Sequence, residues 1–279
     1  MVSHRGYGNG TANGAVNEEA PLLGRSRSTS TRPWTWRQRM AADVSCSWSD
    51  AVLLACYMVT GLLDSAAIQV WGAFVSMQTG NTIYVGLGLA SLVSGTAVSP
   101  RLFKSALSVT CFCVGSFFFA RFHRLFSPKR RWVLCASFAA QTVSTAAAAT
   151  IITTHPPGSD TDELAWNVLV PIALIAFQSC GQAVASRALR QNALNSVVLT
   201  SIYCDLFSDQ DLFALQNVTR NQRVAAPLLL FLGAVVGGVF SENAVGIAGV
   251  LWLAAGLKLC LVLAWFLWAA EKEANDDCT

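Results

Sequence analysis

Residues 61–89 read GLLDSAAIQVWGAFVSMQTGNTIYVGLGL, an apolar stretch of membrane-spanning length. It contains one carboxylate, Asp64, and a polar break at Thr79-Gly80-Asn81. A carboxylate at the centre of a membrane helix costs about 2.5 to 3.5 kcal/mol, so we expect Asp64 to face other helices or a wet cavity. The Thr-Gly-Asn break suits a helix that stops and restarts at membrane depth. Together these features predict a polytopic membrane protein with a polar site in its interior.

Composition places the whole chain in the membrane class. Of its 279 residues, 53% are hydrophobic and only 13% are charged, whereas soluble domains usually carry about 25% charged residues. The charged residues separate apolar runs of about 17 to 25 residues, the length that spans about 30 Å of hydrocarbon. The formal charge of +3 therefore reflects membrane topology, and we expect the lipid bilayer, not nucleic acid, as partner.

Six long and two short apolar runs follow the first 49 residues. They predict an all-α integral membrane protein with about six transmembrane helices plus two short re-entrant or broken helices. The long runs are 50–70, 102–121, 131–153, 164–186, 224–241 and 245–268, and the short runs are 79–97 and 195–212.

The distribution of charge indicates that the short runs do not cross. The stretch from Arg121 to Arg131 carries five Lys/Arg and no acid, and the N-terminal tail carries six Arg. Both are expected to be cytosolic, because basic residues favour that side. An even number of crossings must then lie between them, so 79–97 returns to its own side. Arg101 and Lys104 fall outside in this arrangement and argue against it, and the alternatives are seven or eight crossings.

The order of the runs predicts an inverted repeat. Each half, 50–153 and 164–268, has a long run, a short run and two further long runs. Three crossings per half invert the second half relative to the first, which is a recurrent design of transporters. Chance similarity between apolar runs is the alternative. The membrane domain extends over 50–270 and is followed by a short acidic cytosolic tail, 271–279.

Residues 1–49 are rich in Gly, Ser, Asn and Arg, which predicts a disordered cytosolic tail. Within it, Glu18, Leu22 and Leu23 fit the acidic dileucine pattern that sorting adaptors read. A chance match to this short pattern is the alternative. The pattern favours a vacuolar or endosomal membrane over the plasma membrane, with both termini cytosolic. The oligomeric state is left open.

The polar residues within the apolar runs are the candidate site, and each has two readings. Asp64 could couple transport to a proton or cation, or hold helices together by a hydrogen bond or an ion pair. Lys258, in the last run, could pair with Asp64 or snorkel. Thr79, Gly80 and Asn81 could leave helix N–H groups free for an anion, or simply cap a helix.

The second half supplies matching polar residues. Gln178, Gln182 and Thr200 would face the first group across an inverted repeat, and could bind a solute. The alternative is that they join helices by hydrogen bonds of about 0.6 kcal/mol each. Gly233 and Gly237 permit close helix approach, and we expect this packing within the chain more than in a dimer.

The sequence contains no GxSxG, HExxH, P-loop or CxxC pattern, and its three histidines lie outside the predicted spans. We therefore expect no metal, no cofactor and no enzymatic activity.

The motifs of both halves carry a family resemblance. These motifs are Gly61, Asp64, Phe74 and Gln78-Thr79-Gly80-Asn81 in the first half, and Ala176-Phe177-Gln178, Gly181-Gln182-Ala183 and Leu199-Thr200-Ser201 in the second. In them the chain resembles the DUF1275 family of YoaK-like membrane proteins. The stretches VLTSIYCDL at 198–206 and Arg223-Val224-Ala225-Ala226 resemble its fungal branch. The resemblance covers about 48–270 and implies a multipass membrane protein of uncharacterised function.

Two functions fit these features. The first is a secondary transporter or permease of a small solute, whose site surrounds Asp64 and Thr79 to Asn81. The second is a non-transporting scaffold, assembly or lipid-handling protein, in which the same residues only join helices.

Overall fold

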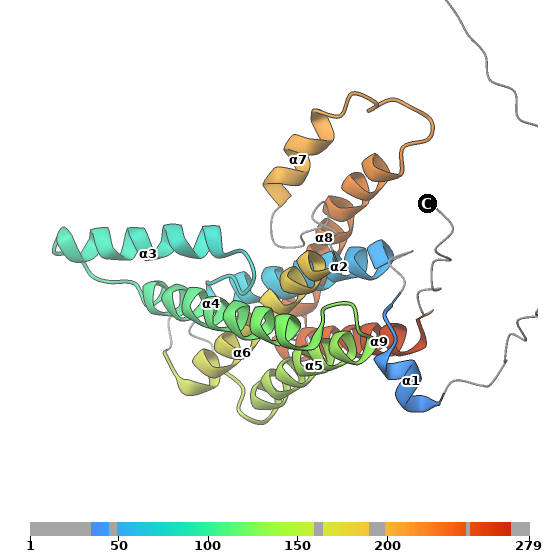
Figure 1. The fold of residues 1–279 in the computed structure, drawn as a ribbon. Helices are drawn as coiled ribbons and strands as arrows, with labels where there is room; N and C mark the ends of the chain where they lie inside the picture. Colours follow the sequence, from blue (N-terminus) through green and yellow to red (C-terminus); the bar gives the residue numbers. More distant parts are fainter. Residues whose placement is uncertain (1–34, 45–48, 159–163, 190–198, 244–245, 269–279) are drawn as a thin grey trace, which may run out of the picture. The chain divides into compact units, whose positions relative to one another are not determined.

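The computed structural model describes residues 35–44, 49–158, 164–189, 199–243 and 246–268, and this part of the chain is helical without a β-strand (Figure 1). The all-α prediction is confirmed. The helices are α1 (Trp36–Ala41), α2 (Ser49–Trp71), α3 (Gln78–Val93), α4 (Arg101–Phe126), α5 (Arg131–Thr154), α6 (Trp166–Ala188), α7 (Leu199–Phe207), α8 (Val218–Glu242) and α9 (Gly246–Leu267).

Six of these helices are long and apolar enough to cross a membrane: α2, α4, α5, α6, α8 and α9. The shortest, α9, has 22 residues, which at 1.5 Å per residue is about 33 Å. The two short helices do not reach that length. α3 has 16 residues and α7 has nine, so neither spans about 30 Å of hydrocarbon. Within the described residues, the membrane domain therefore has six candidate spans and the two short helices α3 and α7, and α1 precedes them.

Hydrogen bonds at both ends of α2 set its direction relative to α8. Near the start of the two helices, Gln222 Nε2 donates to Asp50 Oδ2 at 2.5 Å. Near their ends, Gln69 Nε2 donates to Glu242 Oε1 at 2.6 Å. The two helices therefore run parallel, as the first and fifth of six crossings must.

The opposite relation holds between α5 and α9. Arg131, at the start of α5, donates from Nη2 to the carbonyl oxygen of Trp268 at 2.6 Å, just after the end of α9. Trp252, near the start of α9, donates from Nε1 to Thr153 Oγ1 at 3.1 Å, near the end of α5. The two helices are antiparallel, as the third and sixth of six crossings must be.

Arg131 also fixes the start of the described chain. Its Nη1 donates to the carbonyl oxygen of Arg39 at 2.8 Å, and the backbone N–H of Val44 donates to Lys129 at 3.0 Å. Residues 39–44, the α4–α5 turn and the end of α9 therefore share one end of the bundle. An even number of crossings separates them, as the basic residues predicted. Which side of the membrane this end faces stays a prediction.

Glycines let α2 and α8 pack at backbone distance. A Cβ atom on Gly61 would overlap the carbonyl oxygen of Leu230, and one on Gly233 would overlap that of Met58. Gly237 lies in the same way against Leu62. The Gly233-x-x-x-Gly237 motif therefore packs within the chain, as expected.

The interface between α4 and α6 has the same character. A Cβ on Gly115 would overlap the carbonyl oxygen of Phe177. A two-fold relation between the halves would exchange the pair α2–α8 with the pair α4–α6. It would map the pair α5–α9 onto itself. The repeat itself stays a prediction.

The break after α2 does not lie at Thr79-Gly80-Asn81. α2 ends at Trp71 and α3 begins at Gln78, so the non-helical segment is 72–77. Gly72 begins this segment with φ +74°, a conformation that glycine adopts without steric cost. Thr79, Gly80 and Asn81 belong to the first turn of α3, which then runs alongside α4 (Figure 1). Of the second short run, residues 199–212 lie in the described part.

Candidate functional site

The Asp64 carboxylate accepts hydrogen bonds from the 72–77 segment. Oδ1 accepts from the backbone N–H groups of Val75 and Ser76, both at 2.9 Å. Oδ2 accepts from the hydroxyl of Ser76. The side chain is 7% exposed. In a continuous helix, backbone carbonyl oxygens would accept from these two N–H groups, and here Asp64 takes their place. Backbone groups inside a membrane require such partners.

Asn81 holds the same segment from the other side. The backbone N–H of Phe74 donates to Asn81 Oδ1 at 3.0 Å, and Asn81 Nδ2 donates back to the Phe74 carbonyl oxygen at 2.7 Å. Ser108 of α4 also donates to that carbonyl oxygen, at 2.8 Å, and accepts from Asn81 Nδ2 at 3.1 Å. Together, Asp64, Ser76, Asn81 and Ser108 form the closed cluster, in which every side-chain polar group has a partner.

The neighbours of Asn81 do not join the closed cluster through polar groups. A Cβ on Gly80 would lie 2.8 Å from the Phe74 ring, so Gly80 allows α3 to pack against that ring. The side chain of Thr79 is exposed. The N-cap of α3 is Met77, which forms no side-chain capping bond. The side-chain cap predicted for the start of α3 is therefore not formed, and the anion site predicted for Thr79-Gly80-Asn81 stays a prediction.

A second set of buried polar residues lies between α2, α5, α6 and α9. Lys258 of α9 is 0% exposed, and its Nζ donates to Gln141 Oε1 of α5 at 2.9 Å. Lys258 therefore follows neither of the two interpretations that the sequence left open, since it is buried and bonds to Gln141 and not to Asp64. Asp64 instead accepts hydrogen bonds from the 72–77 segment, and Arg223 pairs with Asp209 at 3.4 Å elsewhere in the bundle.

Gln182 and Gln178 of α6 complete this set. Gln182 Nε2 donates to Thr60 Oγ1 of α2 at 3.5 Å, and Gln178 Nε2 donates to Ser179 at 3.1 Å. The oxygen of each amide, Oε1, is buried without a partner, and so is Gln141 Nε2. Thr60, Gln141, Gln178, Gln182 and Lys258 form the open cluster, named for these unpartnered atoms.

A glycine brings α5 and α6 together here. A Cβ on Gly181 would lie 2.6 Å from Gln141 Nε2, so the Gln141 side chain occupies the space above Gly181. Gly181 lies between Gln178 and Gln182 in sequence. The open cluster therefore depends on a close approach that only glycine permits.

The structure splits the predicted site into two. Asp64 and Asn81 belong to the closed cluster, Gly80 packs beside it against the Phe74 ring, and Gln178 and Gln182 belong to the open cluster. Thr200 is exposed on α7, which packs on α8. Sequence reasoning missed Gln141 and Thr60. An amide in the middle of the apolar run 131–153 was the available signal for Gln141.

Two other predictions find no test here. Glu18, Leu22 and Leu23 lie outside the described residues. The part of the chain that the structure describes holds no group of three His, Cys, Asp or Glu suited to a metal ion.

Comparison with known proteins identifies the family alone. No curated protein and no solved structure matches the chain significantly. A family model described as "Protein of unknown function (DUF1275)" matches residues 52–264. The match spans both polar clusters and does not address the YoaK-like or fungal features. The chain belongs to the DUF1275 family of multipass membrane proteins.

Proposed function

We propose that this protein is a secondary transporter or permease of a small solute, not an enzyme, and that the open cluster lines its solute site. The observation that carries the proposal is Lys258, a fully buried lysine whose charge meets a neutral amide. Removing an ammonium group from water costs several kcal/mol unless a counter-charge compensates it. Intramembrane charges kept at such a cost mark substrate or ion pathways in membrane proteins.

The open cluster also defines the chemistry of the solute. Lys258 and Gln141 Nε2 present a positive charge and a free donor, whereas Gln178 and Gln182 present free acceptor oxygens. An unsatisfied buried polar group costs about 1 to 3 kcal/mol. A small molecule with an anionic group and a hydrogen-bond donor would satisfy all of these atoms.

The helix arrangement supports movement around this site. Helix pairs α2–α8 and α4–α6 approach closely at glycines, and inverted halves of a transporter move against each other around a central site. The closed cluster lies where α2 gives way to α3. Protonation of Asp64 would remove the negative charge of the carboxylate that accepts from the N–H groups of Val75 and Ser76. These hydrogen bonds would then be weaker and the 72–77 segment less stable.

One observation favours the non-transporting alternative. Asp64 and Asn81 use their polar groups on the 72–77 backbone, as helix-joining residues of a scaffold, assembly or lipid-handling protein would. Water access to the open cluster separates the two functions, because a solute site must open to water and a purely structural cluster need not.

Cysteine labelling measures that access. In a chain whose nine native cysteines are replaced by serine, Gln182→Cys is exposed to membrane-impermeant thiosulfonate reagents in proteoliposomes. The control is Ala176→Cys, on the same helix and equally buried. We expect labelling at 182 and none at 176, with an anionic reagent faster than a cationic one because of Lys258. Absence of labelling at both positions would favour the scaffold function.

A panel of small anions then tests transport itself. Acetate, lactate, glutamate and inorganic phosphate are each added to the purified chain, and the melting temperature is measured. An anion that stabilises the wild type but not Lys258→Met is next tested for uptake into proteoliposomes. If stabilisation occurs without uptake, the protein binds solutes and does not transport them.

A further inference from the structure

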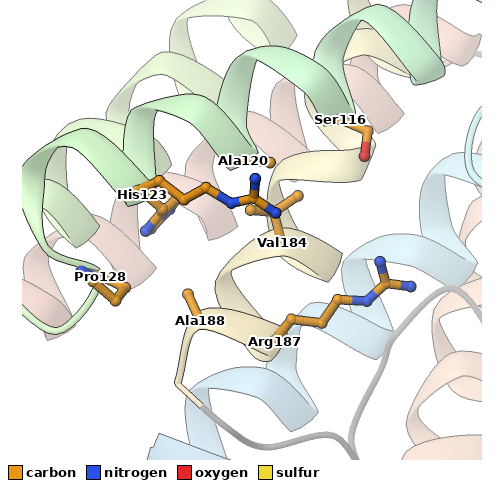
Figure 2. Close-up of a pocket in the computed structure, with 8 residues that line it drawn as sticks. Ser116, Ala120, His123, Pro128, Val184, Arg187 and Ala188 are labelled. Carbon is orange, nitrogen blue, oxygen red and sulfur yellow. The ribbon is translucent and has the colours of Figure 1, made fainter.

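A pocket of about 360 Å³ lies between α4 and α6, away from both polar clusters (Figure 2). α4 forms one wall and α6 the other. Ser116, His123 and Arg124 supply polar groups from α4, and Arg187 supplies them from α6. The pocket reaches Pro128 in the α4–α5 turn, so it lies at the end of the bundle where Arg131 binds Arg39 and Trp268.

The polar lining is positive and carries unused hydrogen-bonding capacity. Arg124 and Arg187 are exposed, and neither has a hydrogen bond or ion pair to any residue in the described ranges. His123 is 3% exposed and contacts Ser137 through Nε2 at 3.3 Å, but its Nδ1 is buried without a partner. Among the described residues, no Asp or Glu lines the pocket. Two guanidinium groups without carboxylates match an oxyanion, above all phosphate.

The rest of the lining is apolar and lies beside lipid-facing surface. Ala120, Val184 and Ala188 contribute methyl groups. On α4, Phe117 and Phe118 are exposed, as they would be toward acyl chains. Basic pockets between transmembrane helices on the cytoplasmic side bind anionic lipid headgroups. The pocket lies at the end that we propose to be cytosolic.

We propose that this pocket binds a phosphate group between Arg124 and Arg187, as carried by the headgroup of an anionic phospholipid or by a soluble phosphate ester. His123 lines the same pocket, with its Nδ1 without a partner. The proposal does not depend on transport, because no residue of the open cluster lines the pocket.

Native mass spectrometry of the full chain in detergent tests this inference. The probes are phosphatidylglycerol, phosphatidylcholine, glycerol 3-phosphate and inorganic phosphate. The variants are Arg124→Gln, Arg187→Gln and the pair combined. The matched control is Arg121→Gln on the same helix, whose guanidinium stacks on Phe117 at 5.2 Å and does not line the pocket.

We expect the wild type to bind phosphatidylglycerol more tightly than phosphatidylcholine. Each pocket substitution should weaken binding about fivefold, and the double variant about 25-fold, because each basic residue near anionic headgroups contributes about 1 kcal/mol. Arg121→Gln should change it less than about twofold. Lipid binding that glycerol 3-phosphate and inorganic phosphate do not displace assigns the site to a headgroup, and their binding with the same arginine dependence assigns it to a soluble phosphate ester.

The proposal is overturned if the double variant binds every probe as the wild type does, or loses no more than Arg121→Gln. Both arginines are exposed, so the variants should keep their fold. The melting temperature in zwitterionic detergent checks this, and the single variants decide the question if the double variant unfolds.

Discussion

The protein buries two polar clusters, and they differ in how completely they are satisfied. In the closed cluster, Asp64 and Asn81 accept from three successive backbone N–H groups, those of Phe74, Val75 and Ser76. In the open cluster, Gln178, Gln182 and Gln141 each keep one polar atom without a partner around Lys258. Both are buried in the same bundle, so burial alone does not distinguish them.

This difference indicates how to distinguish buried polar residues that stabilise the fold from those that bind a ligand. A side chain that saturates backbone groups stabilises the fold, because those groups have no other partner in a membrane. A side chain with unsatisfied polar atoms has lost hydrogen bonds to water, and a ligand that bonds to those atoms gains that free energy on binding. Substitution should therefore destabilise the closed cluster and change ligand-dependent properties of the open one.

The largest effect is expected from Asp64→Ala. It leaves the N–H groups of Val75 and Ser76 without acceptors, and each orphaned group costs about 1 to 3 kcal/mol. We expect a loss of about 3 kcal/mol or more, measured by unfolding in mixed micelles with increasing SDS. Asp64→Asn keeps one acceptor oxygen and should lose only about 1 kcal/mol. Equal losses for the two variants would mean that the charge, not the acceptor, stabilises the segment.

Asn81→Ala should have the next largest effect. It removes the acceptor of the Phe74 N–H, while the Phe74 carbonyl oxygen keeps its bond from Ser108. One orphaned donor corresponds to a loss of about 2 kcal/mol in the same SDS titration. Thr79→Ala, an exposed neighbour in the same turn, is the control and should stay within about 0.5 kcal/mol. A similar loss in both variants would refute the specific role of Asn81.

Lys258→Met should act in the opposite direction. Removing the buried ammonium group recovers a desolvation cost of several kcal/mol, which exceeds the cost of about 1 to 3 kcal/mol for leaving Gln141 Oε1 without its donor. We expect the free energy of unfolding to rise by about 1 kcal/mol, and the response to small anions to disappear. A destabilisation as large as that of Asp64→Ala would show that Lys258 supports the fold, and the distinction between the clusters would fail.

The smallest effect on stability is expected from Gln182→Leu. Its hydrogen bond to Thr60 is long, at 3.5 Å, and interhelical bonds in membranes average about 0.6 kcal/mol. Stability should therefore change by about that amount or less, while the affinity for a stabilising anion falls. Thermal melting with and without that anion separates the two quantities. Unchanged affinity would remove Gln182 from the site.

The predictions from sequence succeeded where one-dimensional patterns carry the information. Run length gave six spans, and the charges of Arg121 to Arg131 indicated correctly that this turn and residues 39–44 share one end of the bundle. The position of the break was wrong, because Gly72 and the side-chain acceptors Asp64 and Asn81 allow the helix to end at Trp71. No short pattern shows that a side chain seven residues away will bind a backbone group.

The sequence by itself determined the all-α membrane architecture, since the hydrocarbon core imposes a length and a composition on every crossing segment. It also indicated that Asp64 faces the protein interior, because a carboxylate exposed to lipid is costly, whereas it left open whether Lys258 is buried. Only the tertiary structure decided their partners. Lys258 meets Gln141 and Asp64 meets the 72–77 backbone, because helix packing through Gly61, Gly181 and their neighbours sets which side chains come within hydrogen-bond distance.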